Sequence, residues 1–236
     1  MKKKLLVFVN KIMNKLFKNL IKYILNFLLS NNYSIKILSI LKEIQSYQRV
    51  KYKKKFFFFL NLNWITQFRI KTFYSKEPET LNWISSFKKN QIFWDIGANI
   101  GLYSIFASYY NVLTYAFEPS VFNLEILVKN IIKNKLQNKI KVIVNPISKK
   151  SEISNFNYSS EESGAALSSF KLKNKKIINF YKMNSISVRD LKKNYNIKKP
   201  DHVKIDVDGN EFEILDSLLH EYKSIKSFLI EVNKDK

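Results

Sequence analysis

The sequence predicts an α/β fold in which a mostly parallel sheet carries helices on both faces. From residue 91 onward, short apolar segments alternate with amphipathic ones, and the first apolar segment ends in a glycine-containing turn. This alternation favours parallel strands, because each helix carries the chain back to start the next strand beside the last one. The length of 236 residues, 46% of them hydrophobic, suits one main domain with an appendage.

The elements of the main domain follow from the spacing of its apolar residues. Helical periodicity predicts crossover helices at residues 102–109 and 121–132. Apolar runs predict five strands, at residues 92–96, 112–117, 139–144, 203–207 and 227–232. Ligands of such sheets bind beyond the carboxyl ends of the strands, so functional residues are expected there.

Two further elements precede this domain. Residues 47–76 are aromatic and β-branched with lysines between them, which predicts short strands or a hairpin. Residues 77–87 predict a helix, because Pro78 suits its first turn.

We divide the chain into three regions on these grounds. Residues 1–46 form a basic helical region, residues 47–90 a lead-in of strands and a helix, and residues 91–236 the main domain. Only three residues follow Asn233, so the main domain is expected to be short at its C-terminus.

The first 60 residues carry 14 basic side chains and one acidic one. Lysines share one helical face, formed by Lys11, Lys15, Lys18 and Lys22, and apolar side chains share the opposite one, formed by Val9, Ile12, Met13, Leu16, Leu20, Ile24, Phe27 and Leu28. We favour packing of this apolar face on the main domain, and the alternative is a helix lying in the surface of an anionic membrane through residues 1–30. The lysines argue against a membrane-spanning segment.

Composition narrows the classes of function. The chain has no cysteine and two histidines, which excludes disulfides, thiolate metal sites and cysteine nucleophiles and fits a reducing compartment. The net charge is +22, but only Arg49, Arg69 and Arg189 are arginine, so we expect no specific nucleic-acid partner. No alanine precedes Ala98, so no small-residue secretory cleavage site is visible. We expect a cytoplasmic location, with the inner membrane surface as the alternative.

The turn after the first predicted strand, Gly97-Ala98-Asn99-Ile100-Gly101, has the features of a cofactor loop. Its G-x-x-x-G spacing and the preceding Asp95 differ from a dinucleotide loop and suit a cofactor without phosphates. Glu118, at the end of the second strand, can accept hydrogen bonds from both hydroxyls of a ribose. Together they predict an S-adenosylmethionine site, with candidate cofactor-binding residues Asp95, Gly97, Asn99, Gly101, Glu118 and Pro119.

Four motifs in order give the chain a family resemblance. They are FYSKEPET, FWDIGANIGLYSIFA, AFEPSVFNLEILVKNIIKN and VKIDVDGNEFEIL, within residues 68–233. The chain resembles the FkbM-type family of S-adenosylmethionine-dependent methyltransferases. The resemblance implies a class I, Rossmann-like methyltransferase fold. It also implies an enzyme that methylates oxygen, with an acceptor that is commonly a sugar hydroxyl of a glycan, glycolipid or secondary metabolite.

Methylation of an alcohol needs a group that removes its proton. Asp206 and Asp208 end the fourth predicted strand on one side of it, so they are the predicted catalytic residues, and Glu231 ends the next strand. Two such carboxylates together could hold a divalent cation, although we predict no metal site. The alternative is that residues 208–211 are only a turn and the start of a helix.

Two other functions stay open. An RNA ribose methyltransferase would explain the charge, and it needs no aromatic clamp of the kind that methylates base amino groups. A non-catalytic membrane-surface protein could keep the same fold and act through its N-terminal helix. Residues 162–170, ESGAALSSF, suit either a mobile loop over the acceptor site or a plain surface loop.

Overall fold

The computed structural model describes residues 2–29, 36, 39–40, 44–171 and 177–232, and the side chains of residues 2–12 and 28–29 are not among the described parts. The chain forms two compact units, Met1–Gln45 and Ser46–Lys236. The first unit contains helix α1 (Lys2–Leu29). Within the described residues, no helix is both long enough and apolar enough to cross a membrane.

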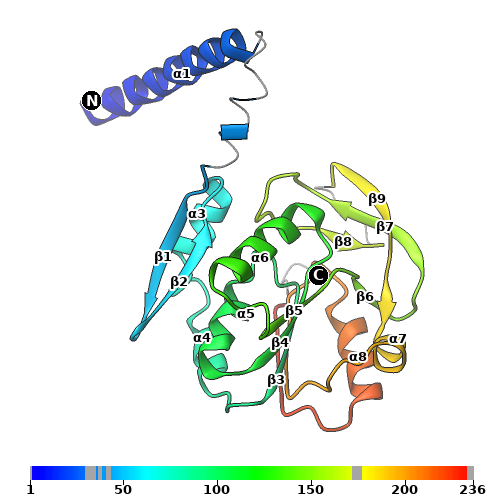
Figure 1. Cartoon of the computed structure of the whole chain (residues 1–236). Coiled ribbons are helices and arrows are strands. Elements are labelled where there is room, and N and C mark those ends of the chain that lie inside the picture. Colours follow the sequence, from blue (N-terminus) through cyan, green and yellow to red (C-terminus); the bar gives the residue numbers. More distant parts are fainter. Residues whose placement is uncertain (1, 30–35, 37–38, 41–43, 172–176, 233–236) are drawn as a thin grey trace. The chain divides into compact units, whose positions relative to one another are not determined.

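The second unit is built on a parallel five-stranded sheet in the order β12-β11-β3-β4-β5 (Figure 1). Its strands are β3 (Ile92–Ile96), β4 (Leu113–Phe117), β5 (Ile140–Ile143), β11 (His202–Ile205) and β12 (Ser227–Ile230). Strand β3 is the first strand of this sheet in the sequence and lies at its centre, with later strands on both sides. The strand order therefore reverses beside β3. The predicted α/β fold is confirmed, and each of the five predicted strands is present with its ends within two residues of the predicted ones.

Helices cover both faces of this sheet. One face packs on α4 (Pro78–Ser85), α5 (Leu102–Ala107) and α6 (Val121–Lys133), and the other packs on α7 (Val188–Asn194) and α8 (Glu211–Glu221). A short 3₁₀ turn, η1 (Ser108–Tyr110), follows α5. Neighbouring strand residues point to opposite faces, so Phe93 joins the first core and Trp94 the second.

Residues 47–76 contain the predicted hairpin and a helix that was not predicted. Strands β1 (Tyr47–Tyr52) and β2 (Lys55–Leu60) pair antiparallel, and α3 (Trp64–Lys71) follows. The expectation of strands alone is therefore wrong for residues 64–71. A capping box explains the helix: the Thr66 backbone N–H donates to the Asn63 side chain at 2.8 Å, and the Thr66 hydroxyl accepts from the Asn63 N–H at 3.0 Å.

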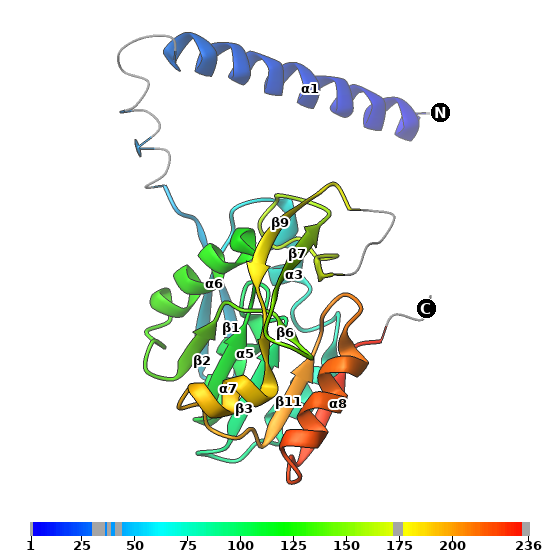
Figure 2. The same ribbon diagram turned by 90° about the vertical axis from the view of Figure 1, so that its right-hand side faces the viewer.

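Between β5 and β11 the chain forms a small antiparallel sheet that the sequence did not predict. Its strand order is β8-β7-β9, with β7 (Ile153–Tyr158), β8 (Ser169–Phe170) and β9 (Asn179–Asn184). Strands β6 (Ile147–Ser148) and β10 (Ile186–Ser187) form a separate parallel pair. Both views place the small sheet at the end of the central sheet toward which the parallel strands point (Figure 2).

Candidate cofactor and active site

A cavity of about 220 Å³ lies at the carboxyl edge of the central sheet. Its wall combines the turns that follow β3, β4, β11 and β12 with a loop between β7 and β8. It includes six residues predicted from the sequence, namely Gly97, Asn99, Glu118, Pro119, Asp206 and Asp208, and also Glu231. The structure therefore brings six of the eight predicted cofactor-binding and catalytic residues to one site, and Asp95 and Gly101 lie outside its wall.

The glycine turn is fixed by backbone bonds to the neighbouring strand. The N–H groups of Gly97 and Ala98 both donate to the carbonyl of Phe117, each at 2.9 Å. Gly97 has φ +86° and Gly101 φ +84°, a left-handed conformation that favours glycine. A Cβ on Gly101 would lie 2.5 Å from the Leu127 side chain, so this glycine allows α5 and α6 to pack closely. Gly101 itself does not line the cavity.

Glu118 is buried at the cavity wall, with 5% of its surface exposed. One carboxylate oxygen accepts the Asn99 N–H at 2.6 Å and the other accepts the Ser120 N–H at 2.9 Å. Burial raises the pKa of Glu118 to about 7, against the lowering effect of these two donors. The residue thus holds the glycine turn in place, and its carboxylate, which has about four acceptor positions, can accept a further donor such as a ribose hydroxyl.

Asp95 lies beneath the cavity and is not part of its wall. One oxygen accepts the Ser104 hydroxyl at 2.6 Å, and the other has no hydrogen-bond partner among the described residues. Burial raises the pKa of Asp95, and the Lys204 ammonium opposes the shift. Lys204 is its register partner on β11. The geometry gives Asp95 an electrostatic contact with Lys204 and no direct place at the cavity.

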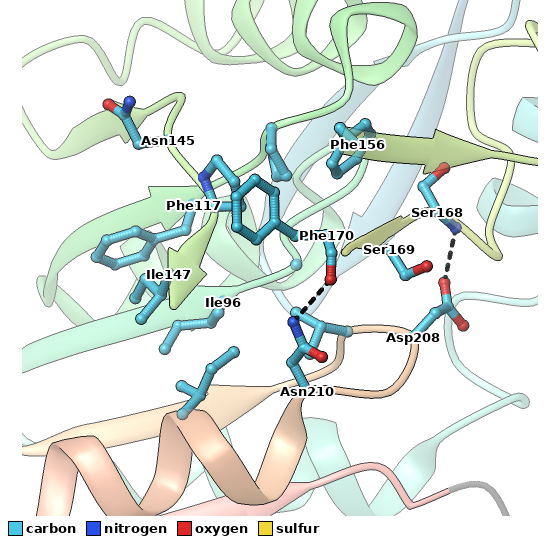
Figure 3. Close-up of a pocket in the computed structure, with 15 residues that line it drawn as sticks. Ile96, Phe117, Asn145, Ile147, Phe156, Ser168, Ser169, Phe170, Asp208 and Asn210 are labelled. Carbon is cyan, nitrogen blue, oxygen red and sulfur yellow. Dashed lines mark hydrogen bonds between the residues drawn. The ribbon is translucent and has the colours of Figure 1, made fainter. Parts of the chain in front are cut away.

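An apolar recess of about 40 Å³ adjoins the cavity (Figure 3). Gly97, Pro119, Phe156, Ser168, Val207 and Asp208 line both spaces, while Phe117, Ile147 and Phe170 line the recess alone. Asn210 donates to the Phe170 carbonyl at 3.1 Å, which ties β8 to the start of α8. Apolar walls with a few polar groups suit one edge of an aromatic ring system such as adenine.

Three charged residues interact in series at the cavity, namely Lys204, Asp206 and Glu231. Lys204, 1% exposed, forms an ion pair with Asp206, and the carboxyl groups of Asp206 and Glu231 lie close enough for each to shift the pKa of the other. Burial works to raise the pKa of Asp206, but Lys204 outweighs it and holds that pKa below its usual range. Burial and then the Asp206 charge raise the pKa of Glu231 to about 7. Asp206 is thus the ionised partner, and Glu231 can gain or lose a proton near neutral pH.

The two predicted catalytic aspartates follow β11 and are not part of it, because the strand ends at Ile205. Asp208 has a different setting from Asp206. Its carboxylate accepts the Ser168 N–H at 3.1 Å and a backbone bond from Leu167, while burial raises its pKa. Asp208 therefore fastens the loop between β7 and β8 to the sheet edge.

That loop, residues 159–168, lies against the glycine turn. The Asn99 side chain donates to the Ala165 carbonyl at 2.9 Å, and Asn123 accepts the Gly164 N–H at 2.8 Å. Ala165, Ala166, Leu167 and Ser168 form part of the cavity wall. Part of ESGAALSSF therefore lines the cavity, and the prediction that it is a mobile loop over the acceptor site stays a prediction.

Sequence reasoning missed two basic residues at the cavity, Arg69 of α3 and Lys76 after it. The Arg69 Nε donates to the Gly164 carbonyl at 2.5 Å, and its charge lowers the pKa of Glu118 against burial. Lys76 pairs with Glu77 at 2.8 Å. Of the described residues lining the cavity, these two are basic and four are acidic. The only feature of the sequence that could have drawn attention to Arg69 is that arginine is rare in this lysine-rich chain.

The described residues contain no cluster of three or more histidine, cysteine, aspartate or glutamate side chains that could hold a metal ion. The polar groups at the site instead fit the parts of S-adenosylmethionine. Glu118 suits the ribose, the apolar recess suits the adenine, and the basic and acidic groups suit the two charges of an amino acid. A parallel sheet with these features at its reversal point defines a class I methyltransferase.

The family is shown by sequence comparison: residues 95–236 match the methyltransferase FkbM domain, and the chain belongs to that family. The predicted resemblance is confirmed. The prediction of S-adenosylmethionine as cofactor is also confirmed, because this is a family of methyltransferases that use it. No curated protein sequence matches the chain significantly.

Several solved structures resemble the chain in fold. A precorrin-6Y C5,15-methyltransferase from Geobacter metallireducens GS-15 is 19% identical over 67% of this chain and 63% of its own, with a TM-score of 0.42. TrmK of M. capricolum, solved with S-adenosylhomocysteine, is 20% identical over 64% of this chain and 49% of its own, with a TM-score of 0.36. The chain spans less than two thirds of the length of either protein.

Proposed function

We propose that the protein transfers a methyl group from S-adenosylmethionine to a hydroxyl oxygen, and that the acceptor is a sugar hydroxyl of a glycan, glycolipid or secondary metabolite. The observation that carries the proposal is the Asp206–Glu231 pair at the cavity, since an alcohol must lose its proton as it attacks. A glutamate with a pKa of about 7 is matched to that task at neutral pH.

The cofactor-binding roles follow from the walls of the cavity. Glu118 receives the ribose hydroxyls, and the recess at Phe117, Ile147 and Phe170 receives the adenine. Arg69 and Lys76 attract the carboxylate of the methionine portion, because the other charged side chains at the wall would repel it. When bound by these residues, S-adenosylmethionine would supply an electrophilic methyl group to the acceptor oxygen, with S-adenosylhomocysteine as the leaving group.

Glu231 takes the proton that leaves the acceptor hydroxyl. Asp206 accepts a hydrogen bond from the protonated Glu231 and so stabilises it, while Lys204 keeps Asp206 ionised throughout. Asp208, the other predicted catalytic residue, holds the loop over the site through the Ser168 N–H. In this assignment Asp206 positions the base and Glu231 is the catalytic residue.

A sugar hydroxyl fits this chemistry better than a nucleobase amine. The turn after β11 is Asp206-Val207-Asp208-Gly209, so it offers carboxylates to a hydroxyl and no aromatic ring to stack on a base. The FkbM family membership supports the same acceptor class. Methylation of an RNA ribose is the second candidate, because a ribose hydroxyl makes the same demand on the base.

The test is methyl transfer from radiolabelled S-adenosylmethionine to a panel of glycans, glycolipids and RNA. The parent should label a carbohydrate acceptor, and Glu231→Gln should lower turnover by about 10²- to 10⁴-fold with little change in cofactor affinity. Glu125→Gln, an exposed glutamate on α6, is the matched control and should keep full activity. Labelling of RNA with no carbohydrate labelled would overturn the acceptor assignment.

A further inference from the structure

Helix α1 exposes large apolar side chains along its described residues 13–27. Its 28 residues extend about 42 Å at a rise of about 1.5 Å per residue. Leu16 is 58% exposed, Leu20 56% and Phe27 64%. Other large apolar side chains of α1 are also exposed, namely Met13, Phe17, Ile21, Tyr23 and Ile24. So large a set of exposed apolar groups on one helix indicates a surface that binds a partner.

The lysines on the opposite face of α1 indicate the charge of that partner. Lys15, Lys18 and Lys22 are exposed and lie at helical spacings of three and four residues. The whole of α1 contains no aspartate or glutamate. This face favours an anionic partner.

The combination of the two faces distinguishes a membrane from a nucleic acid. A nucleic acid would satisfy the lysines and leave the apolar side chains in water. An anionic bilayer satisfies both, because the apolar face enters the boundary of the acyl chains while the lysines stay among the headgroups. The lysines also prevent α1 from entering the bilayer core, in agreement with the absence of a spanning helix among the described residues.

We propose that α1 binds the surface of an anionic lipid bilayer, lying in its plane. This is a binding surface separate from the methyl-transfer site, and it does not depend on the identity of the acceptor. The role differs from packing of α1 on the main domain, which the sequence analysis favoured over the membrane alternative.

The test uses the full-length protein and sedimentation with lipid vesicles. One set contains phosphatidylcholine alone, and the other contains equal parts of phosphatidylcholine and phosphatidylglycerol. The parent should bind the anionic vesicles much more tightly, and about 1 M salt should remove most of the preference because the Debye length falls to about 3 Å. The triple change Lys15→Gln, Lys18→Gln and Lys22→Gln should weaken anionic binding about 100-fold, at about fivefold for each lysine.

Two further variants separate the contributions of charge and apolar surface. The matched control is Lys54→Gln, Lys88→Gln and Lys150→Gln, which removes the same charge from exposed positions of the second unit and should bind vesicles like the parent. The change Leu20→Gln with Phe27→Gln keeps every lysine and should also lose binding. Binding of S-adenosylhomocysteine by each variant shows that the second unit remains folded.

Four results would overturn the proposal. They are equal binding to neutral and anionic vesicles, equal losses in the two lysine variants, RNA binding without vesicle binding, and a dimer that forms through α1 in solution.

Discussion

The carbonyl oxygen of Asp206 lies 1.9 Å from the position that a Cβ on Gly97 would occupy. The two residues belong to the turns after β11 and β3, which are adjacent strands, and the Asp206 N–H donates to the Ile96 carbonyl at 2.9 Å. Gly97 thus permits the turn that carries Asp206 and Asp208 to lie directly against the glycine turn. The closeness of the two turns depends on the absence of a side chain at this one position.

Changing Gly97→Ala should reduce both stability and cofactor binding. The added methyl group must push the Asp206 backbone away, and overpacking of this kind costs about 1–3 kcal/mol of unfolding free energy. Thermal unfolding and titration with S-adenosylhomocysteine measure the two effects. Gly164→Ala is the control, because Gly164 has the same φ of +86° but its nearest neighbour would be 3.1 Å away. Equal losses in both variants would assign the effect to backbone strain alone.

The change Glu118→Gln should weaken cofactor binding. Both oxygens of Glu118 accept backbone N–H groups, so an amide would set its own N–H₂ against one of these donors and loosen the glycine turn. Binding of S-adenosylhomocysteine should lose about 1.5–3 kcal/mol, as expected for hydrogen bonds to a charged group. Isothermal titration of the parent, Glu118→Gln and the exposed control Glu125→Gln checks this. Unchanged affinity in Glu118→Gln would remove Glu118 from the cofactor site.

The raised pKa of Glu118 predicts a pH effect on the stability of the cofactor-free protein. Between pH 4.5 and about 7 the folded protein holds a proton on Glu118 that the unfolded chain has already released. The contribution of Glu118 to stability is therefore full below pH 4.5 and is lost as the pH rises through about 7. Glu118→Gln stays neutral, so its melting temperature should rise relative to that of the parent between pH 5 and pH 8. A constant difference across this range would contradict the raised pKa.

The coupling between Asp206 and Glu231 predicts a shift in the pH profile of methyl transfer. Turnover should rise with pH and level off above about 7, as Glu231 loses its proton. Asp206→Asn removes a negative charge that helps to raise the pKa of Glu231, so the inflection should move to lower pH while maximal turnover also falls. A purely structural role for Asp206 would lower turnover at every pH by the same factor and leave the inflection in place.

The features that could be predicted from the sequence are those determined by residues close together along the chain. Strand β3, the Gly97 turn and Glu118 are neighbours in sequence, and apolar runs and glycine spacing are enough to place them. Helix α3 was missed because its aromatic and β-branched residues favour strands, and the capping box of Asn63 and Thr66 overrides that preference.

Other features depend on contacts between distant segments. The exclusion of Asp95 from the cavity wall reflects its burial opposite Lys204, a residue more than 100 positions later. The small sheet β8-β7-β9 lacked clear alternation in sequence, and the loop it holds is fastened by Asp208 and Asn99 from other elements. No local sequence pattern encodes such pairings. The roles proposed for Asp206, Asp208 and Glu231 therefore depend on the three-dimensional structure.

Arg69 and Lys76 give the last prediction, because the proposed function places the cofactor's carboxylate beside them. Arg69→Gln and Lys76→Gln should each weaken binding of S-adenosylhomocysteine by about 10-fold, the loss of one charge-assisted contact. Binding of 5′-methylthioadenosine, which has the same adenine and ribose but no amino acid portion, should change little. Lys71→Gln, an exposed lysine of α3, is the control and should bind both compounds as the parent does. If Arg69 instead serves only to hold the Gly164 carbonyl, its loss should weaken both compounds equally, and the carboxylate would then need another partner.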